Sequence, residues 1–289
     1  MKESGESKFA ARWLGAGVDR GAVIGWLLAF TAFEWLRIKL DITEPIAGLS
    51  DALDAFTAVE MFEIAMLARL FLRRPATSPL SALEAAATVA GAAAIMLIVD
   101  AKPVFAAGLL SLYVLVRFAP NRADRPLALA LFAFIAQYWL QAGPFIWLHE
   151  AVGTVDAQVL RWALGANGHA VGGSGTIVAQ LDGSFAVDVL VGCSSSFVVS
   201  IVVPAFAIAL LGLRGGFLRS DLLSLAGLIA ATVLLNWIRL YPTSLSHEGW
   251  LYWHEGQGAS FIAVANALLI ALFVHLALRR DGRHLAAAA

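Results

Sequence analysis

Residues 192–213 read GCSSSFVVSIVVPAFAIALLGL, a short polar turn followed by an unbroken apolar run. The turn contains Cys193, the only cysteine of the chain, and the apolar run covers Ser196–Leu213. A run of this length approaches the roughly 20 apolar residues with which a helix crosses a bilayer. In lipid the backbone polar groups must be satisfied within the segment. The stretch therefore predicts a membrane-spanning helix with a thiol at its amino-terminal end.

The rest of the chain has the same apolar character. Of the 289 residues, 60% are hydrophobic and 14% are charged, and the mean hydropathy is +0.78. These values are typical of an integral-membrane protein and not of a soluble domain. A formal net charge of −1 gives no reason to expect nucleic acid as a partner, and one cysteine cannot form an internal disulfide. Residues 1–20 are polar and precede a span-length apolar run, so we expect a cytoplasmic tail and no cleavable signal peptide.

Eight segments approach the length of a span, which predicts an all-α polytopic membrane protein forming one integral-membrane domain over residues 1–289. The fourth segment is short, and the first two contain Glu34, Glu60 and Glu63. The segments cover approximately Ala22–Leu40, Ala55–Leu72, Leu80–Val99, Val104–Phe118, Leu127–Leu148, Ser196–Leu213, Ser220–Ile238 and Ala259–Leu278.

The distribution of Lys and Arg predicts the orientation, because cytoplasmic loops carry an excess of both. With both termini in the cytoplasm, all but five of the 20 basic residues fall in cytoplasmic segments. The five exceptions are Arg37, Lys39, Lys102, Arg161 and Arg239. Such a protein lies in the inner (cytoplasmic) membrane of a cell, and Cys193 faces the extracytoplasmic side.

The longest outer segment, residues 149–190, contains two predicted elements. Val152–Gly165 is expected to be an amphipathic helix lying along the interface. Its apolar face would contain Val155, Val159, Leu160, Ala163 and Leu164, with Asp156 and Arg161 on another face.

A β-hairpin follows this helix. Thr176–Leu181 and Ser184–Leu190 are β-prone, and Asp182-Gly183 between them is a strong hairpin signal. The second strand runs directly into Gly192-Cys193, so the hairpin is expected to position the cysteine and to offer an edge for an extended peptide.

Three reactive side chains are expected at the same end of the last three spans. Cys193 opens a helix, where free N–H groups and the positive end of the dipole favour a thiolate. Arg239 ends the next span and can stabilise a thiolate or an oxyanion. His254, with His247 as its rival, can act as general base and acid. Ser194, Ser195 and Asn236 are expected to contact the substrate.

Each of these residues also has a purely structural interpretation. A lone cysteine packs as a small hydrophobic side chain, and an arginine at the edge of hydrocarbon extends to the interface. His254 lies among Trp250, Tyr252 and Trp253, which is typical of an interfacial aromatic belt. We find no metal-ligand pattern and no glycine-rich phosphate loop, so we expect chemistry without a metal or cofactor.

Residues 127–278 resemble the exosortase/archaeosortase family of membrane cysteine transpeptidases. The resemblance rests on the hairpin into Cys193-Ser194, on Asn236-x-x-Arg239 and on His254-x-x-x-Gly258-x-x-Phe261. One departure is Ser195, where the family usually has Gly or Ala.

This resemblance implies a nucleophilic Cys193, a catalytic Arg239 and a general acid or base at His254. It further implies membrane-anchored substrates with a C-terminal sorting signal of the PEP-CTERM type, and an envelope acceptor, polysaccharide or lipid. A second hypothesis is a transporter of small molecules or ions that uses Glu34, Glu60 and Glu63. A third is a non-catalytic envelope scaffold.

Overall fold

The computed structural model describes Val23 and residues 25–27, 58–73, 80–98, 103–142 and 146–287. These residues belong to two compact units. The first draws on Met1–Phe56 and Leu67–Ala136, and the second on Thr57–Met66 and Gln137–Ala289. The second unit contains every described residue of the expected site.

The first unit contains paired apolar helices whose contacts depend on small residues. Helix α5 (Ala82–Ile98) packs on α6 (Pro103–Phe118), where the Tyr113 hydroxyl donates to the carbonyl of Thr88 at 3.3 Å. A Cβ atom at Gly91 would lie 3.0 Å from that hydroxyl, so glycine permits the close approach. Helix α4 (Ala58–Arg73) contributes to both units, as does α7 (Arg125–Ala142).

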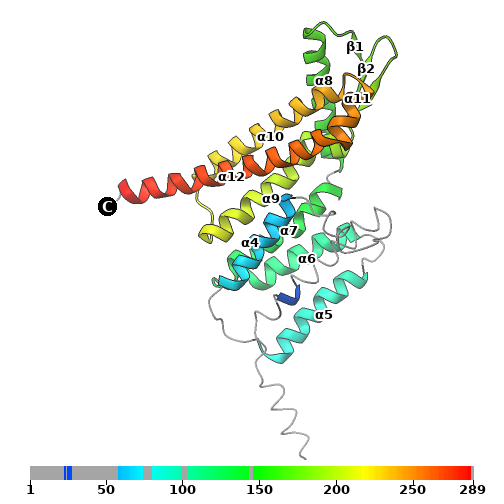
Figure 1. Cartoon of the computed structure of the whole chain (residues 1–289). Coiled ribbons are helices and arrows are strands. Elements are labelled where there is room, and N and C mark those ends of the chain that lie inside the picture. Colours follow the sequence, from blue (N-terminus) through cyan, green and yellow to red (C-terminus); the bar gives the residue numbers. More distant parts are fainter. Residues whose placement is uncertain are drawn as a thin grey trace, which may run out of the picture. The chain divides into compact units, whose positions relative to one another are not determined.

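The second unit is built around three long apolar helices (Figure 1). They are α9 (Ser195–Arg214), α10 (Asp221–Thr243) and α12 (Gln257–Ala287). Their core includes Val202 and Phe206 of α9, Leu228 of α10 and Ile270 of α12. Ser194 caps the start of α9 by accepting from the Phe197 N–H, and Gly215 ends it with φ of 81°, a conformation that glycine adopts without strain.

Three helices in the described part of the chain are long and apolar enough to span a membrane: Ser195–Arg214, Asp221–Thr243 and Gln257–Arg280. They correspond to the last three predicted spans. Apolar stretches in α5, α6 and α7 are shorter, and most of the first predicted span lies outside the described residues. The protein is thus a largely helical membrane protein, and the count of eight spans stays a prediction.

The predicted β-hairpin is confirmed, with shorter strands than expected. Strand β2 (Ile177–Gln180) pairs antiparallel with β3 (Ala186–Asp188), and Val178 lies opposite Val187. Gly183 has a φ of 74° in the connecting turn. A third strand, β1 (Val171–Gly172), pairs with β2 and was not predicted.

Helix α8 (Ile146–Ala166) differs from the predicted interfacial helix in its start and in its buried face. It begins six residues earlier than predicted. Asp156 is buried, whereas Val155 is half exposed. The aspartate therefore lies on the face of α8 that packs against the rest of the second unit. The prediction was wrong here because a buried carboxylate with protein hydrogen-bond partners breaks the simple division into apolar and polar faces.

Candidate active site

Cys193 lies in a tight turn between β3 and α9. It is the last residue of the short 3-10 helix Val191–Cys193, and its N–H donates to the carbonyl of Leu190 at 2.8 Å. The N–H of Ser194 donates to the same carbonyl at 3.1 Å. The cysteine is 8% exposed and packs in a cluster with Val187, Val189 and Leu240. The hairpin therefore delivers the thiol to the end of α9, as its sequence position predicted.

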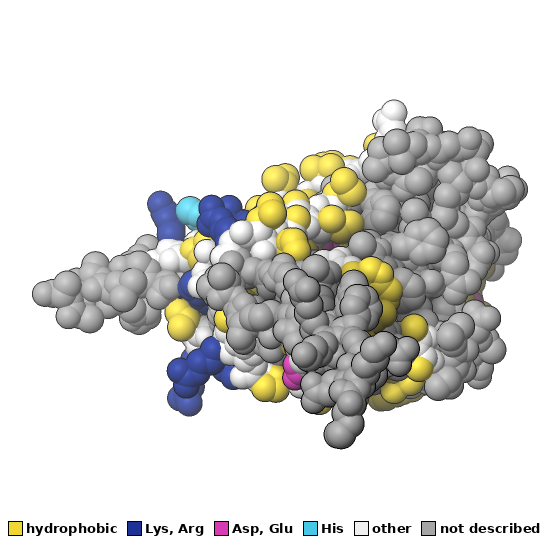
Figure 2. Space-filling view, turned by 90° about the horizontal axis from the view of Figure 1, so that it is seen from below, with side chains coloured by type: hydrophobic (Ala, Val, Ile, Leu, Met, Phe, Trp, Pro, Cys, Tyr) yellow, Lys and Arg dark blue, Asp and Glu magenta, His cyan; other side chains and the backbone are white. Residues whose placement is uncertain are grey.

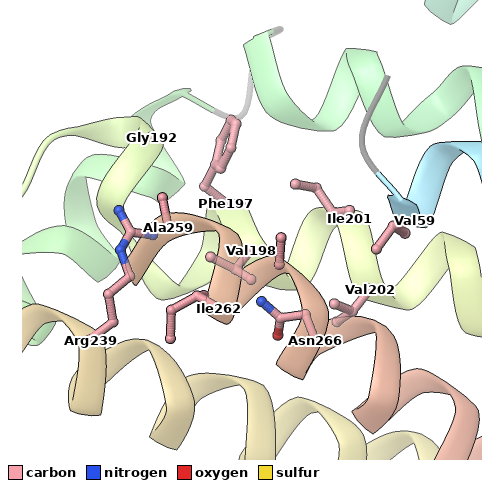
Figure 3. A pocket seen from close by; sticks show the side chains of 11 residues that line it. Val59, Gly192, Phe197, Val198, Ile201, Val202, Arg239, Ala259, Ile262 and Asn266 are labelled. Atoms are coloured by element: carbon pink, nitrogen blue, oxygen red, sulfur yellow. The ribbon is translucent and has the colours of Figure 1, made fainter. Parts of the chain in front are cut away.

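Arg239 brings a positive charge to this thiol from the last full turn of α10. Its Nη2 atom lies 4.0 Å from the Cys193 Sγ atom. No carboxylate of the described residues forms an ion pair with it, and its Nε–H is buried without an acceptor among them. Figure 3 shows the guanidinium rising from α10 toward the turn at Gly192. The charge is therefore available to a thiolate or an oxyanion.

Burial opposes ionisation of this thiol. Loss of solvent raises the pKa of Cys193, and the carboxylate of Asp188 raises it further, while the charge and hydrogen bond of Arg239 lower it. The net shift is upward. The prediction that the helix end favours a thiolate did not take account of this burial, which opposes it.

Asn236 lies one turn before Arg239 and holds the backbone around the cysteine. Its Nδ2 atom donates to the Cys193 carbonyl at 2.9 Å and to the Ser195 hydroxyl at 3.2 Å. Ser194, Ser195 and Asn236 are all at most 2% exposed, so their observed contacts are internal. The Asn236 Oδ1 atom is buried and has no hydrogen-bond donor among the described residues.

Asp156 is a residue of this site for which the sequence analysis predicted no role. Its carboxylate accepts from the Ser195 N–H at 2.7 Å, from the Ser195 hydroxyl at 2.9 Å and from Trp237 Nε1 at 2.7 Å. It thereby joins α8, the start of α9 and α10 at one point. Its spacing of four from Leu160 and eight from Leu164, both buried, is the signal that could have placed it on the inner face.

A second buried side chain, His149, also fastens the start of α9. It is 2% exposed, with Nε2 at 2.8 Å from the Leu140 carbonyl and Nδ1 at 2.8 Å from the Ser196 hydroxyl. Because a carbonyl can only accept, Nε2 carries a proton, and in the neutral ring Nδ1 accepts from Ser196. In the sequence, His149 stands at the start of the longest outer segment, and no role was predicted for it.

His254 and His247 lie on either side of one tryptophan. His247 belongs to α11 (His247–Trp250), and His254 to the π-helical turn η2 (Leu251–Glu255). The Trp250 ring is stacked with His254 at 4.8 Å and with His247 at 6.0 Å between centroids. Trp250 in turn packs against the cluster that contains Cys193. His247 is exposed, whereas His254 is half-buried.

This arrangement can support nucleophilic chemistry at a carbonyl, with a thiol, a cation and an imidazole at one end of three helices. A π-helical turn is rare and is often found at functional sites. Among the described residues, no group of three or more His, Cys, Asp or Glu side chains could hold a metal ion. No protein-family model matches the chain, and neither curated proteins nor solved structures give a match.

Proposed function

We propose that the chain is a membrane-embedded cysteine transpeptidase or protease that cleaves C-terminal sorting signals of exported proteins. The observation that carries the proposal is the 4.0 Å contact between the Cys193 Sγ atom and the Arg239 guanidinium, which has no described carboxylate partner. A half-buried cation beside a buried thiol can stabilise negative charge on sulfur or oxygen. The resemblance of residues 127–278 to exosortases supplies the substrate class.

The reaction begins when a base, His254 in this proposal, takes the thiol proton of Cys193. The thiolate attacks the carbonyl carbon of the scissile amide, and Arg239 stabilises the oxyanion that forms. As the C–N bond breaks, the departing amine receives the proton from His254, and the acyl group stays on sulfur as a thioester. An envelope acceptor nucleophile, or water, then attacks the thioester and releases the thiol.

The charge distribution supports an extracytoplasmic site in the inner membrane. Arg214, Arg219, Arg279 and Arg280 lie at the ends of α9, α10 and α12 that are opposite to Cys193. Figure 2 shows Lys and Arg side chains gathered toward the distal part of α12, next to a hydrophobic surface. Because basic residues favour the cytoplasmic side, this end would lie inside and the thiol outside.

The test is processing of a membrane-anchored protein with a short C-terminal motif, one span and an Arg cluster. We expect cells with the wild-type chain to cleave it, and cells with Cys193→Ala or Cys193→Ser to accumulate the full-length form. Equal membrane levels of the three chains are the control. Cleavage by the alanine variant would overturn the proposal.

The transporter hypothesis has one observation of its own in Glu63. This residue is 0% exposed in α4, and neither carboxylate oxygen has a hydrogen-bond partner among the described residues. Glu60, three residues earlier, is also buried, while Glu34 lies outside the described residues. A transporter would lose flux on Glu63→Gln and keep it on Cys193→Ala, whereas the transpeptidase would show the opposite pattern in processing.

A further inference from the structure

The sheet beside Cys193 ends in a strand that is paired on one side only. Its order is β1-β2-β3, and within the described part of the chain β3 pairs with β2 alone. The sheet lies at the same end of the second unit as α8 and α11 (Figure 1). β3 ends at Asp188, five residues before Cys193. A strand edge of this kind can pair with a further strand from another chain.

The hydrogen bonds between β2 and β3 show which backbone groups of β3 are unused. The N–H of Gln180 donates to the Phe185 carbonyl at 2.8 Å, and the N–H of Val189 donates to the Thr176 carbonyl at 2.9 Å. In an antiparallel pair, the backbone groups of successive residues alternate between the two edges of the strand. The groups of residues 185, 187 and 189 therefore face β2, and those of residues 186 and 188 face outward.

Three of the outward groups have no hydrogen-bond partner among the described residues. They are the N–H and the carbonyl of Ala186 and the N–H of Asp188, because the Asp188 carbonyl already accepts from the Leu190 N–H at 2.8 Å. Ala186 and Asp188 are exposed, whereas Val187 between them is buried. The edge thus presents a donor, an acceptor and a donor in chain order, which an extended peptide backbone complements.

We propose that the substrate segment preceding the scissile bond binds along this edge as a fourth strand, parallel to β3. In parallel pairing, the Ala186 N–H donates to the carbonyl of one substrate residue, and the Ala186 carbonyl accepts from the N–H two residues further along. The Asp188 N–H donates to the carbonyl of that second residue. This inference rests on the proposed function, and it assigns recognition of this segment to its backbone, with proline excluded at the one position that donates.

The direction of the two chains favours parallel pairing. β3 continues through Cys193 into α9, which is long and apolar enough to cross a membrane. A substrate with a C-terminal membrane segment likewise passes into the membrane after the bond that Cys193 attacks. Both chains therefore run toward the membrane in the same direction. The edge precedes Cys193 in the chain, just as the bound segment precedes the scissile bond.

Proline substitution tests the backbone contact, because proline lacks an N–H. Ala186→Pro removes the N–H that would donate to the substrate and none that bonds to β2, and edge strands tolerate proline at such positions. We expect KM for the tail-bearing substrate to rise about threefold to tenfold with kcat nearly unchanged, the range for one lost hydrogen bond. An unchanged KM would overturn the proposal.

Ala170→Pro is the matched control at the other end of the sheet. Ala170 is exposed just before β1, and its N–H has no hydrogen bond among the described residues. This variant should keep the wild-type KM. Thermal unfolding in detergent compares the stability of both proline variants with that of the wild type. An equal rise of KM in both variants would reject a specific contact at Ala186.

Cross-linking tests the register without turnover and without proline. In a Cys193→Ser chain, Ala186→Cys or Asp188→Cys is combined with tail-bearing substrates that each carry one cysteine, and dibromobimane joins neighbouring thiols in membranes. We expect one preferred substrate position for Ala186→Cys. For Asp188→Cys the preferred position should lie about two residues nearer the substrate C-terminus, because parallel strands advance together. Asp182→Cys on the exposed hairpin turn should show no preferred position.

Each other outcome of the cross-linking is decisive. A shift toward the substrate N-terminus would show antiparallel pairing, and equal or absent yields at all positions would show that no strand is added, so either result overturns the proposal. Cross-links between two enzyme chains, in place of enzyme and substrate, would assign the edge to a second copy and overturn it as well. Cys193-dependent processing without a preferred position rejects the added strand alone. The expected cross-links, with processing that persists in Cys193→Ala, reject the proposed function alone.

Discussion

Burial is the main cause that raises the pKa of Cys193, and two charges of opposite sign modify it. Arg239 contacts the sulfur, while Asp188 at the end of β3 acts on it from the hairpin. Burial adds to the effect of Asp188, so the thiol is favoured over the thiolate until a base acts.

Removal of the Arg239 charge and removal of the Asp188 charge should shift the pKa of Cys193 in opposite directions. Arg239 lowers the pKa of Cys193, so Arg239→Gln should move the pH profile of iodoacetamide labelling upward and slow labelling near neutral pH. Asp188 raises this pKa, so Asp188→Asn should move the profile downward and speed labelling. At a pH below the midpoint, moving the thiol pKa by about one changes the thiolate fraction, and with it the labelling rate, about tenfold. Asp182→Asn, on the exposed hairpin turn, is the control, and movement in the same direction for both variants would contradict this balance of charges.

The two histidines beside Trp250 can be separated by substitution. We expect His254→Gln to slow processing about 10²- to 10⁴-fold, the usual contribution of a general acid or base. His247→Gln should keep processing near the wild-type rate, because the His247 ring is exposed and its contact is a stack on Trp250. Immunoblots of the tail-bearing substrate over time measure both rates. Loss of processing in His247→Gln alone would transfer the role to His247.

Some of these residues could be identified in the sequence from their chemical type, and others could not. A lone cysteine before an apolar helix and an arginine at the end of another are conspicuous, and the structure brings both together. Asp156 and His149 were not found, because their value depends on partners 39 and 47 residues away in the chain. Helical spacing could place Asp156 on an inner face, but nothing local identifies the partners that hold a buried carboxylate.

Helix α8 and the segment leading to the cysteine are in direct backbone contact at one point. A Cβ atom on Gly153 would lie 2.7 Å from the Val189 carbonyl oxygen, closer than such atoms approach in real structures. Only glycine therefore lets α8 approach this segment, and the approach allows Asp156 to reach the N–H of Ser195. Asp156 of α8 and Asn236 of α10 thus both hold the turn that contains Cys193.

A methyl group at this contact should disturb the turn that contains Cys193. We expect Gly153→Ala to destabilise the protein by about 1–3 kcal/mol through overpacking, and to change the rate of Cys193 labelling. Gly165→Ala is the matched control in the same helix: nothing lies within 4 Å of a Cβ there, and alanine favours the helix. Thermal unfolding in detergent compares the two variants. Equal stability of both would contradict the close contact.

Short-range chemistry predicted some elements well. The Asp-Gly turn and the apolar runs of α9, α10 and α12 follow from local conformational preferences and from the need to satisfy backbone groups in lipid. The strand β1 and the π-helical turn at Leu251–Glu255 were not predicted. A strand of two residues is too short to show an alternation of apolar and polar side chains. The π-helical turn depends on its packing against α10 and α12, which the local sequence does not specify.

At the scale of the molecule, the three helices that are long enough to span a membrane separate the end that contains Cys193 from a basic end. Cys193, Arg239 and His254 lie at the end where α8, the strands and α11 gather (Figure 1). Arg280 at the other end donates to Ser224 at 3.0 Å, and Arg214 pairs with Asp221. Because Lys and Arg favour the cytoplasmic side, basic residues at one end of the helices predict how the helices are oriented in the membrane.

Labelling in intact cells tests that orientation. In a Cys193→Ser background, we expect Asp182→Cys on the hairpin turn to react with a membrane-impermeant maleimide added outside. Arg219→Cys, exposed at the basic end, should react only after permeabilisation. The parent Cys193→Ser chain, which has no thiol, gives the background. External labelling of Arg219→Cys and protection of Asp182→Cys would reverse the orientation.

The sequence by itself determined that the protein is helical and lies in a membrane, and it placed a thiol, a guanidinium and an imidazole at the ends of neighbouring helices. The length of an apolar run and the residues of a turn are local properties, so they can be recognised from the sequence alone. Only the tertiary structure decided that Asp156 and Asn236 hold the turn that contains Cys193, that burial raises the pKa of Cys193, and that a cavity with Asn266 in its wall adjoins this turn. These depend on distances between residues far apart in the chain, which packing sets.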